Sequence, residues 1–363
     1  MRLLDRYVLR HYFRAYAICC VCLVALYVII DLFARIDEFT EHSRGVVEFF
    51  RNFLVYYGYR VPWFFQRLCG LVAILAAMFT LAWLERQNEV VAWLAAGVPG
   101  RRLLYPVLGA TLAVLTLGLA NRELLLPHCR EGLQRTPDDP FGRKSVLVQG
   151  AYDANSVHVG GGVGDPVRQT VEIGRVTLPP RLVGALVHLN CAEMVYRPAS
   201  TAESSGWYLR GTRPESLECS HPCLNWLGPG TYFLHTELDF ERLTRRADWF
   251  QYEPTWSLLH QLEVDPQLPR RDEMIALVHR RLTTPLWEFI LVLMALAYTV
   301  RRQDQKLYWK LGVNVLVNAA MQIVQWGCVW LAQQQYLDAA LANWLPVLLF
   351  GPLALLMLEG MRT

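Results

Sequence analysis

Apolar residues concentrate at the two ends of this 363-residue chain, and the middle has the mixed composition of a soluble domain. A helix needs about 20 mostly apolar residues to cross a bilayer. Six stretches come near this length and hold only one charged residue, Glu288: the residues between Arg14 and Asp31, then 68–84, 103–121, 282–300, 311–337 and 339–358. The pattern predicts six transmembrane helices, three before the middle region and three after it.

The first 14 residues carry arginines at a helical spacing. Arg6, Arg10 and Arg14 recur every four residues, and apolar side chains occupy other faces of the same helix. Such a basic amphipathic stretch is typical of a helix at the membrane surface. We therefore predict an interfacial helix over 1–14 that leads into the first span. A cleaved signal peptide is disfavoured because no small-residue cleavage site follows the apolar run.

Basic residues flank the spans unevenly, and this asymmetry predicts the orientation. Lys and Arg accumulate on the cytoplasmic side of membrane proteins. If the spans alternate in direction, one side receives these flanking residues: Arg2, Arg6, Arg10, Arg14, Arg86, Arg101, Arg102, Arg301, Arg302, Lys306, Lys310 and Arg362. We expect both termini in the cytoplasm and the middle region on the other side of the membrane.

The middle region, 122–272, alternates short β-type runs with turn residues. The runs are SVLVQ, SVHVG, TVEIGRVTL, ALVHL, AEMVYR, GWYLRG and TYFLHTEL. This spacing is typical of a β-sandwich or jelly roll. The predicted fold is a membrane α-helical bundle of six transmembrane helices with an inserted extracytoplasmic all-β jelly-roll-like domain. Its parts are 1–121, 122–272 and 273–363.

Composition narrows the function only slightly. Hydrophobic residues make up 53% of the chain, a little above the usual share of about 45–50% in soluble proteins. The net charge of +3 is too small to indicate nucleic-acid binding, so no nucleic-acid partner is expected. The basic residues lie beside apolar runs instead, which fits a membrane protein.

The chain carries no nucleotide-binding motif, because GRKS at 142–145 lacks the glycine-rich loop of a P-loop. If ATP drives this protein, a separate chain must hydrolyse it and act through a cytoplasmic segment. The segment 85–97 fits, since its apolar residues recur at helical spacing before the chain turns at Gly97. Its candidate contact residues are Glu85, Glu89, Trp93 and Gly97. The alternative is an ordinary amphipathic connecting helix.

Polar residues inside the spans form a second group of candidates. Asn314, Asn318, Gln322 and Gln325 share one face of the fifth span. Exposure of this face to lipid would be unfavourable, so it lines a water-filled cavity or bonds neighbouring helices in a packed bundle. Glu288 is either functional or held by a structural hydrogen bond.

Charged residues follow the first span. Arg35 is the only nearby basic residue at its outer end, and Asp31, Asp37 and Glu38 surround it. Asp31 lies one helical turn from Arg35, so the two can pair on their own helix.

Cysteines in the middle region offer a disulfide, free thiols or a metal site. Cys219, His221 and Cys223, with His235 downstream, have ligand types that suit zinc. The intervening proline and the expected oxidising compartment favour a Cys219–Cys223 disulfide over zinc, or pairing of either with Cys191 or Cys129. We expect no metal and no cofactor.

Four stretches resemble the lipopolysaccharide-export permease family of the LptF/LptG (YjgP/YjgQ) type. They are LDRYVLRHYFRAY at the start, LAWLERQNEVVAWLAAGV from Leu81, HRRLTTPLWEFILVLMALAY from His279 and NWLPVLLFGPLALLM from Asn343. The resemblance covers the spans, roughly half the chain. The middle region is similar only in kind, through pieces such as GWYLRG.

The resemblance implies a function and a set of partners. Such permeases work in pairs, as a paralogous subunit or a second copy, over two copies of a cytoplasmic ABC-type ATPase. They lift lipopolysaccharide from the inner membrane and pass it to a periplasmic bridge of β-jelly-roll proteins. In the family, the glutamate matching Glu89 docks into the ATPase, and the first and fifth spans form the gate. This favours a lipid path beside the polar stripe. Family members often place a basic residue at the outer end of the first span to meet lipid phosphates, which makes Arg35 a candidate contact for a lipid headgroup.

Our prediction is therefore a multi-pass inner-membrane permease subunit for lipopolysaccharide or a similar amphiphile, without enzymatic activity of its own. Two alternatives stay open. One is a membrane-anchored enzyme acting on envelope lipids through the middle region, and the other is a scaffold for envelope assembly without transport. Copurification with an ABC-type ATPase would separate the transporter from both.

Overall fold

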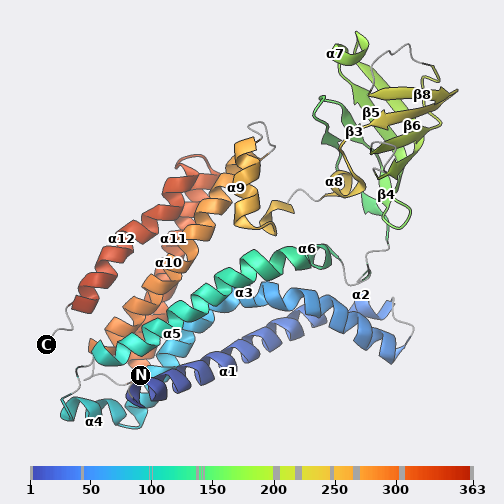
Figure 1. Ribbon diagram of the computed structural model, residues 1–363. Helices are drawn as coiled ribbons and strands as arrows, with labels where there is room; N and C mark the ends of the chain where they lie inside the picture. The colour runs from blue at the N-terminus through green and yellow to red at the C-terminus, as the bar shows by residue number, and fades with distance from the viewer. Residues whose placement is uncertain are drawn as a thin grey trace. The chain divides into compact units, whose positions relative to one another are not determined.

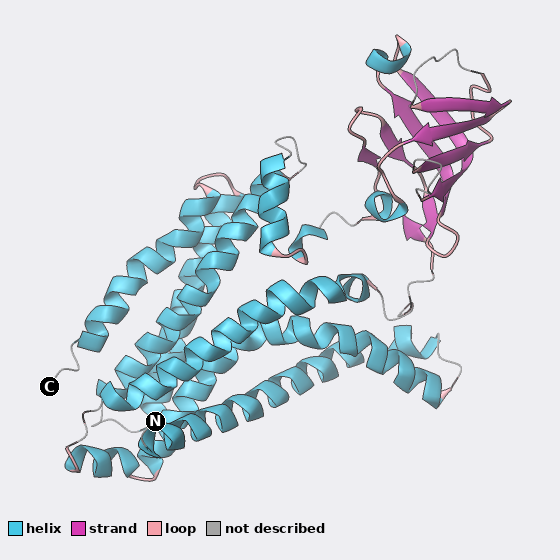
Figure 2. Ribbon diagram, in the orientation of Figure 1, coloured by secondary structure: helices cyan, strands magenta, loops and turns pink. Residues whose placement is uncertain are grey.

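The computed structural model describes residues 3–41, 45–97, 99, 101–135, 139, 141, 144–198, 205–216, 223–245, 249–264, 270–301 and 307–359. The chain divides into two compact units: Met1–Asp138 together with Phe250–Thr363, and Asp139–Trp249 (Figure 1). The first unit is helical, and the second is built around a β-sheet (Figure 2). An inserted β unit between two groups of helices confirms the predicted fold class.

Six of the described helices are long and apolar enough to cross a membrane. They are α1 (Leu3–Ala34), α3 (Val46–Arg86), α5 (Arg101–Ala120), α10 (Arg271–Arg301), α11 (Leu307–Gln333) and α12 (Ala339–Glu359). The helix α5 continues through a π-helical turn, η1 (Asn121–Leu125), into α6 (Leu126–Gln134). Shorter helices are α2 (Ile36–Glu41), α4 (Glu89–Ala95) and α9 (Thr255–Val264).

The helices pack in a definite order within the helical unit. α1 packs against α3 and α5, and α10 packs against α3, α5, α11 and α12. Figure 1 shows α1, α3 and α5 side by side, with α10 between them and the last two helices. The apolar core lies where α1, α3, α5 and α10 meet. In contrast, the most apolar 18-residue windows of α1 and α11 are 0% and 11% buried.

The basic N-terminal stretch is not separated from the first span. α1 runs without a break from Leu3 to Ala34, and Val8 and Tyr12 in its first half are fully buried. The arginines of the stretch lie on its exposed face. The predicted interfacial segment is thus the first part of one long helix.

The β unit is narrower than the predicted range 122–272. It comprises Asp139–Trp249, whereas the flanks on both sides are helical and belong to the other unit. The reason is that α6 and α9 continue or pack against the long helices, although their charged residues resemble soluble sequence.

Nine antiparallel strands form the sheet of the β unit. They are β1 (Val146–Leu147), β2 (Ala151–Tyr152), β3 (His158–Gly160), β4 (Val163–Asp165), β5 (Thr170–Leu178), β6 (Val187–Arg197), β7 (Gly206–Arg210), β8 (Leu224–Gly228) and β9 (Thr231–His235). The order is β1-β4-β5-β6-β7-β9-β8, and β3 pairs with β2 and β5. Two short helices, α7 (Pro180–Val183) and α8 (Phe240–Thr244), and the turn η2 (Trp249–Gln251) complete the described elements.

The core of this unit contains apolar side chains of neighbouring strands. Val171, Val176, Leu189 and Met194 are fully buried on β5 and β6. Burial on β5 does not alternate strictly, because Glu172 and Ile173 are both exposed and Ile173 has a positive φ of 54°. Trp207 of β7 is also fully buried, and its indole N–H donates to the Leu238 carbonyl at 2.7 Å. The predicted runs ALVHL and AEMVYR join into one strand, β6, whereas β2, β4 and β8 were not predicted. The sheet is consistent with the predicted jelly-roll-like domain.

Candidate functional site

The helix α4 follows α3 after a short break at Gln87 and Asn88, and Asn88 has a positive φ of 58°. Its first residue, Glu89, accepts a hydrogen bond from the Tyr7 hydroxyl of α1 at 2.8 Å through Oε1. Glu89 Oε2 is covered and accepts no hydrogen bond from the described residues. An unsatisfied carboxylate oxygen is unfavourable, so this atom is available to a new donor after a modest rearrangement.

Aromatic contacts attach α4 to the start of α1. Trp93 lies edge-on to Tyr7, with ring centroids 6.4 Å apart, and Tyr7 lies 4.5 Å from His11. Val90 is buried on the same side of α4. Gly97 has φ +75°, a conformation that only glycine adopts easily, and it ends the segment. Trp93 and Gly97 therefore hold and terminate α4.

Glu85 and Glu89 are four residues apart, the spacing of one helical turn, but they do not lie on one helix. The helix α3 ends at Arg86, so the two glutamates belong to different helices. Both Glu85 carboxylate oxygens accept hydrogen bonds from Lys310 Nζ of α11 at 3.1 Å. The side chains of Lys310 and Glu85 are 2% and 18% exposed. Glu85 is thus one half of a buried ion pair that joins α3 to α11.

The polar stripe of α11 faces α10 over part of its length. Asn314 is buried, and its Nδ2 donates to Thr299 Oγ1 at 2.8 Å and to the Ala295 carbonyl at 3.3 Å. Gln322 accepts from the indole of Trp287 at 3.4 Å. These contacts match the packed-bundle alternative for Asn314 and Gln322.

The other two residues of the stripe bond only within α11 among the described residues. Asn318 Nδ2 donates to the Asn314 carbonyl at 2.8 Å, and its Oδ1 is buried without a partner. Gln325 accepts from Gln322 Nε2 at 3.0 Å and is half-buried. Asn318 and Gln325 therefore remain the candidates for contact with a passing molecule.

Glu288 packs against the backbone of α3. A Cβ on Gly70 would overlap the Glu288 carboxyl group, so the glycine makes room for it. Within the described part of the chain Glu288 makes no hydrogen bond, and Arg122 of η1 lies within electrostatic range. The structural hydrogen bond predicted as the alternative is absent from these residues.

Arg35 pairs within its own chain segment. Its Nε lies 3.2 Å from Asp31 Oδ1, and Nη1 lies 3.9 Å from Glu38 Oε2. The Tyr57 hydroxyl of α3 donates to the other Asp31 oxygen at 3.0 Å. Two carboxylates thus neutralise Arg35, which makes it a weak candidate for a lipid phosphate.

Four arginines that the sequence analysis did not single out lie at the span ends opposite to the basic residues that predict the orientation. Arg67 of α3, Arg122 of η1, and Arg280 and Arg281 of α10 each adjoin an apolar run. We refer to these four residues as the arginine group. The signal in the sequence is that each borders a span at the end opposite to the basic residues that set the orientation.

Two members of the arginine group have no balancing carboxylate among the described residues. Arg67 and Arg280 lie within electrostatic range of each other, and both side chains are exposed. Neither forms an ion pair with any described residue, and Arg67 only stacks on Trp63 at 5.6 Å. Two neighbouring cations without a counter-ion form an attractive site for a phosphate.

The other two members hold the chain as it returns from the β unit. Arg281 is 3% exposed and donates to the Gln251 carbonyl at 2.8 Å and the Glu253 carbonyl at 2.6 Å. Arg122 donates to the Arg281 carbonyl at 2.9 Å. Glu123 accepts from the Thr255 backbone N–H at 2.6 Å. These contacts fix residues 251–255 against η1 and α10.

The cysteines and histidines predicted to form a disulfide or a zinc site lie only partly within the described residues. Cys219 and His221 lie outside the described residues, so the Cys219–Cys223 disulfide stays a prediction. Cys129 and Cys191 carry free thiols, so neither forms the alternative disulfide with Cys219 or Cys223. Burial raises the pKa of Cys191 to about 12, which keeps its thiol protonated at neutral pH. The described residues contain no cluster of metal-ligand side chains.

Together, six apolar helices among the described residues and the inserted sheet define a multi-pass membrane protein with an inserted β unit. The model of the family described as "Lipopolysaccharide export system permease LptF/LptG" matches residues 6–138 and 232–359. The chain therefore belongs to this family of inner-membrane permeases. A comparison with curated proteins found no match. The unmatched residues 139–231 fall within the β unit, as the predicted resemblance implied.

Proposed function

We propose that this chain is one permease subunit of an ABC-type transporter that extracts lipopolysaccharide, or a similar phosphorylated amphiphile, from the inner membrane. Both termini and α4 lie in the cytoplasm, and the β unit lies in the periplasm, where it passes the lipid to a bridge of jelly-roll proteins. Family membership supports the transport of lipopolysaccharide. The unbalanced pair Arg67 and Arg280 is the observation that carries the substrate class, because it suits a phosphate.

The arginine group lies at the depth where a phosphate would sit. Each member borders the outer end of a span, where headgroups meet the hydrocarbon region in the proposed orientation. Glu288 lies seven residues, or about 10 Å, deeper along α10 than Arg281. The phosphate of a lipid would therefore contact Arg67 and Arg280, and the acyl chains of the same lipid would then pass Glu288 and Asn318.

Energy enters through α4 in this proposal. A separate cytoplasmic ATPase supplies a donor to Glu89, whose Oε2 has no partner among the described residues. Because Tyr7 and Trp93 connect α4 to α1, movement of α4 is transmitted to the first span. The exposed apolar surfaces of α1 and α11 suit a second permease subunit, either a paralogue or another copy.

The proposal is tested by lipid retention in the full assembly of permease pair and ATPase. Replacing Arg67 and Arg280 together by Gln should reduce copurified lipopolysaccharide by about tenfold or more, since charge-assisted hydrogen bonds contribute about 1.5–3 kcal/mol each. Arg168→Gln, at an 81% exposed side chain of the β unit, is the control and should change nothing. Unchanged retention in the double variant would exclude this pair as the phosphate site.

The orientation needs its own measurement. Reporter fusions at Pro99 and after Glu359 should report cytoplasm, and fusions within β5–β7 should report periplasm. A cytoplasmic signal from the β unit would contradict the proposed path of the lipid.

A further inference from the structure

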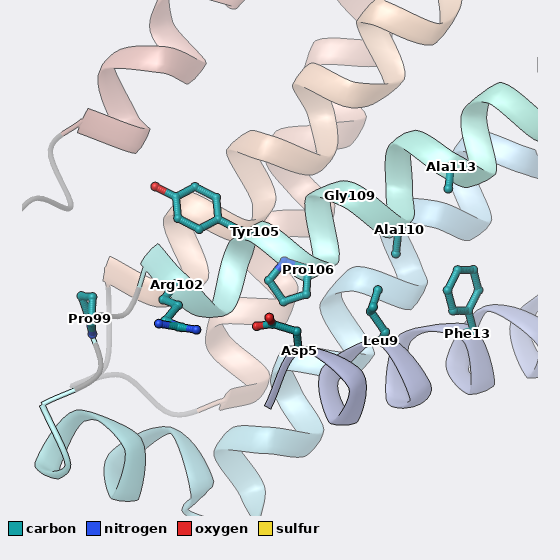
Figure 3. A pocket seen from close by; sticks show the side chains of 10 residues that line it. All are labelled: Asp5, Leu9, Phe13, Pro99, Arg102, Tyr105, Pro106, Gly109, Ala110 and Ala113. Carbon is teal, nitrogen blue, oxygen red and sulfur yellow. The ribbon is translucent and has the colours of Figure 1, made fainter. Parts of the chain in front are cut away.

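A groove lies between the first halves of α1 and α5, away from the arginine group. It has a volume of about 930 Å³ and is lined by Asp5, Leu9, Phe13, Pro99, Arg102, Tyr105, Pro106, Gly109, Ala110 and Ala113 (Figure 3). This volume is at the upper end of the range for small-molecule sites. Arg102 and Arg122 mark opposite ends of one helix, and 20 residues place them about 30 Å apart. The groove is thus separate from the proposed phosphate site.

The groove is polar at one end and apolar along the rest of its length. Figure 3 shows the Asp5 carboxylate and the Arg102 guanidinium at the same end, with Leu9 and Phe13 following along α1. Ala110 and Ala113 face them from α5. An amphiphile with a charged headgroup and an acyl chain has this distribution of polarity.

Small residues on α5 keep the groove open. A Cβ built on Gly109 meets no atom within 4 Å, so this glycine is not required for packing inside the chain. Ala113, one turn further, continues the shallow surface. Phe13 and Tyr105 are 46% and 58% exposed beside it. These exposed rings and the open space are available to an occupant from the bilayer.

The two charges select among bilayer lipids. Arg102 forms no ion pair with a described residue, and its guanidinium can bind a phosphate in a bidentate manner. Asp5 already has a partner, but a carboxylate has about four acceptor positions and can take a further N–H donor. One cation and one anion at the same end match a zwitterionic headgroup with a primary ammonium.

We propose that this groove binds one ethanolamine phospholipid, with its phosphate on Arg102, its ammonium group on Asp5 and an acyl chain along Leu9, Phe13, Gly109 and Ala113. A choline lipid carries the same charges but no N–H donor for Asp5. A glycerol lipid keeps the phosphate and has no ammonium group. The site does not depend on the proposed transport of lipopolysaccharide.

Native mass spectrometry of the full-length protein in detergent tests the site. Phosphatidylethanolamine, phosphatidylcholine and phosphatidylglycerol, with identical acyl chains, are added at equal concentration, and the bound fractions are compared. The parent protein should retain the ethanolamine lipid most. Asp5→Asn should remove the preference for ethanolamine but keep phosphate-dependent binding. Arg102→Gln should lower retention of all three lipids, by about tenfold if one charge-assisted contact is lost.

Gly109→Leu places a bulky side chain in the groove, where a Cβ on this residue meets no atom within 4 Å, and it should abolish retention at this site. Gly109→Ala is the matched control and should retain most of the lipid. Size-exclusion profiles of the variants verify folding. Equal retention in Gly109→Leu and the parent, or no preference among the three lipids in the parent, would overturn the proposal. Loss of a copurifying single-span protein in Gly109→Leu, with lipid retention unchanged, would overturn it in favour of helix docking.

Discussion

The Tyr7 hydroxyl, at the start of α1, donates a hydrogen bond of 2.8 Å to the Glu89 carboxylate at the start of α4. The two residues are 82 positions apart in the sequence. This contact connects the segment proposed to receive an ATPase with the first span. In the proposed function, a movement of α4 caused by the ATPase would reach α1 through this pair of residues.

Removal of the Tyr7 hydroxyl should impair lipid transport and leave ATPase binding unchanged. Tyr7→Phe leaves Glu89 free to bind the ATPase but loses the hydrogen bond to α1. We expect unchanged ATPase recovery with tagged permease and less lipid released per ATP hydrolysed in proteoliposomes. Tyr12→Phe is the control, because it removes a hydrogen bond from α1 to Thr111 of α5 instead. Equal release in Tyr7→Phe and the parent would show that α1 does not depend on this contact.

Loss of the Glu89 carboxylate should weaken ATPase binding. Removing one partner of a buried charged pair at an interface costs about 2–5 kcal/mol, which corresponds to tens to thousands of times in affinity. Recovery of ATPase, normalised to permease, should therefore fall in Glu89→Ala. Glu359→Ala removes an exposed carboxylate at the end of α12 and serves as the control. If Glu89→Ala recovers as much ATPase as Glu359→Ala, the ATPase docks elsewhere.

The ion pair of Glu85 and Lys310 should contribute to stability rather than to docking. Glu85→Ala leaves the Lys310 ammonium, 2% exposed, without its carboxylate. Removal of one partner of a buried ion pair lowers the free energy of unfolding by about 3–5 kcal/mol. Unfolding in denaturant should show this loss, and the double variant Glu85→Met with Lys310→Met should recover most of it. A stable Glu85→Ala protein would indicate that water reaches Lys310.

Asn314 and Asn318 should differ although they lie one turn apart on α11. Asn314 bonds to Thr299 and Ala295 of α10, whereas Asn318 donates to the backbone of its own helix. Polar contacts between membrane helices contribute about 0.6 kcal/mol on average and about 1.7 kcal/mol at most. Asn314→Leu should lower the free energy of unfolding in mixed micelles by about 0.6–1.7 kcal/mol. Asn318→Leu should lower it by less.

Cysteine labelling offers an independent check on the same pair. A cysteine at 318 should react with aqueous reagents more than a cysteine at 314, because Asn314 is 2% exposed. Equal labelling would contradict the different environments that the structure gives them.

Local patterns in the sequence determine a large part of this protein. Runs of uncharged residues predict the six spans, because hydrocarbon excludes charge over the length of a helix. Alternating residues and turn residues predict most strands of the inserted sheet. The segment from Leu81 and the helix from His279 carry the resemblance that family matching confirms.

Tertiary structure decides which polar residues meet. Glu85 and Glu89 have the spacing of one helical turn, but the break at Gln87 and Asn88 sends them to Lys310 and Tyr7. Lys310 lies 225 positions from Glu85 in the sequence, so no local sequence pattern predicts that the two side chains pair. In the same way, Arg67 and Arg280 become neighbours only because α3 packs against α10. Periodicity assigns a residue to a face of its own helix, and packing alone determines which other helix that face meets.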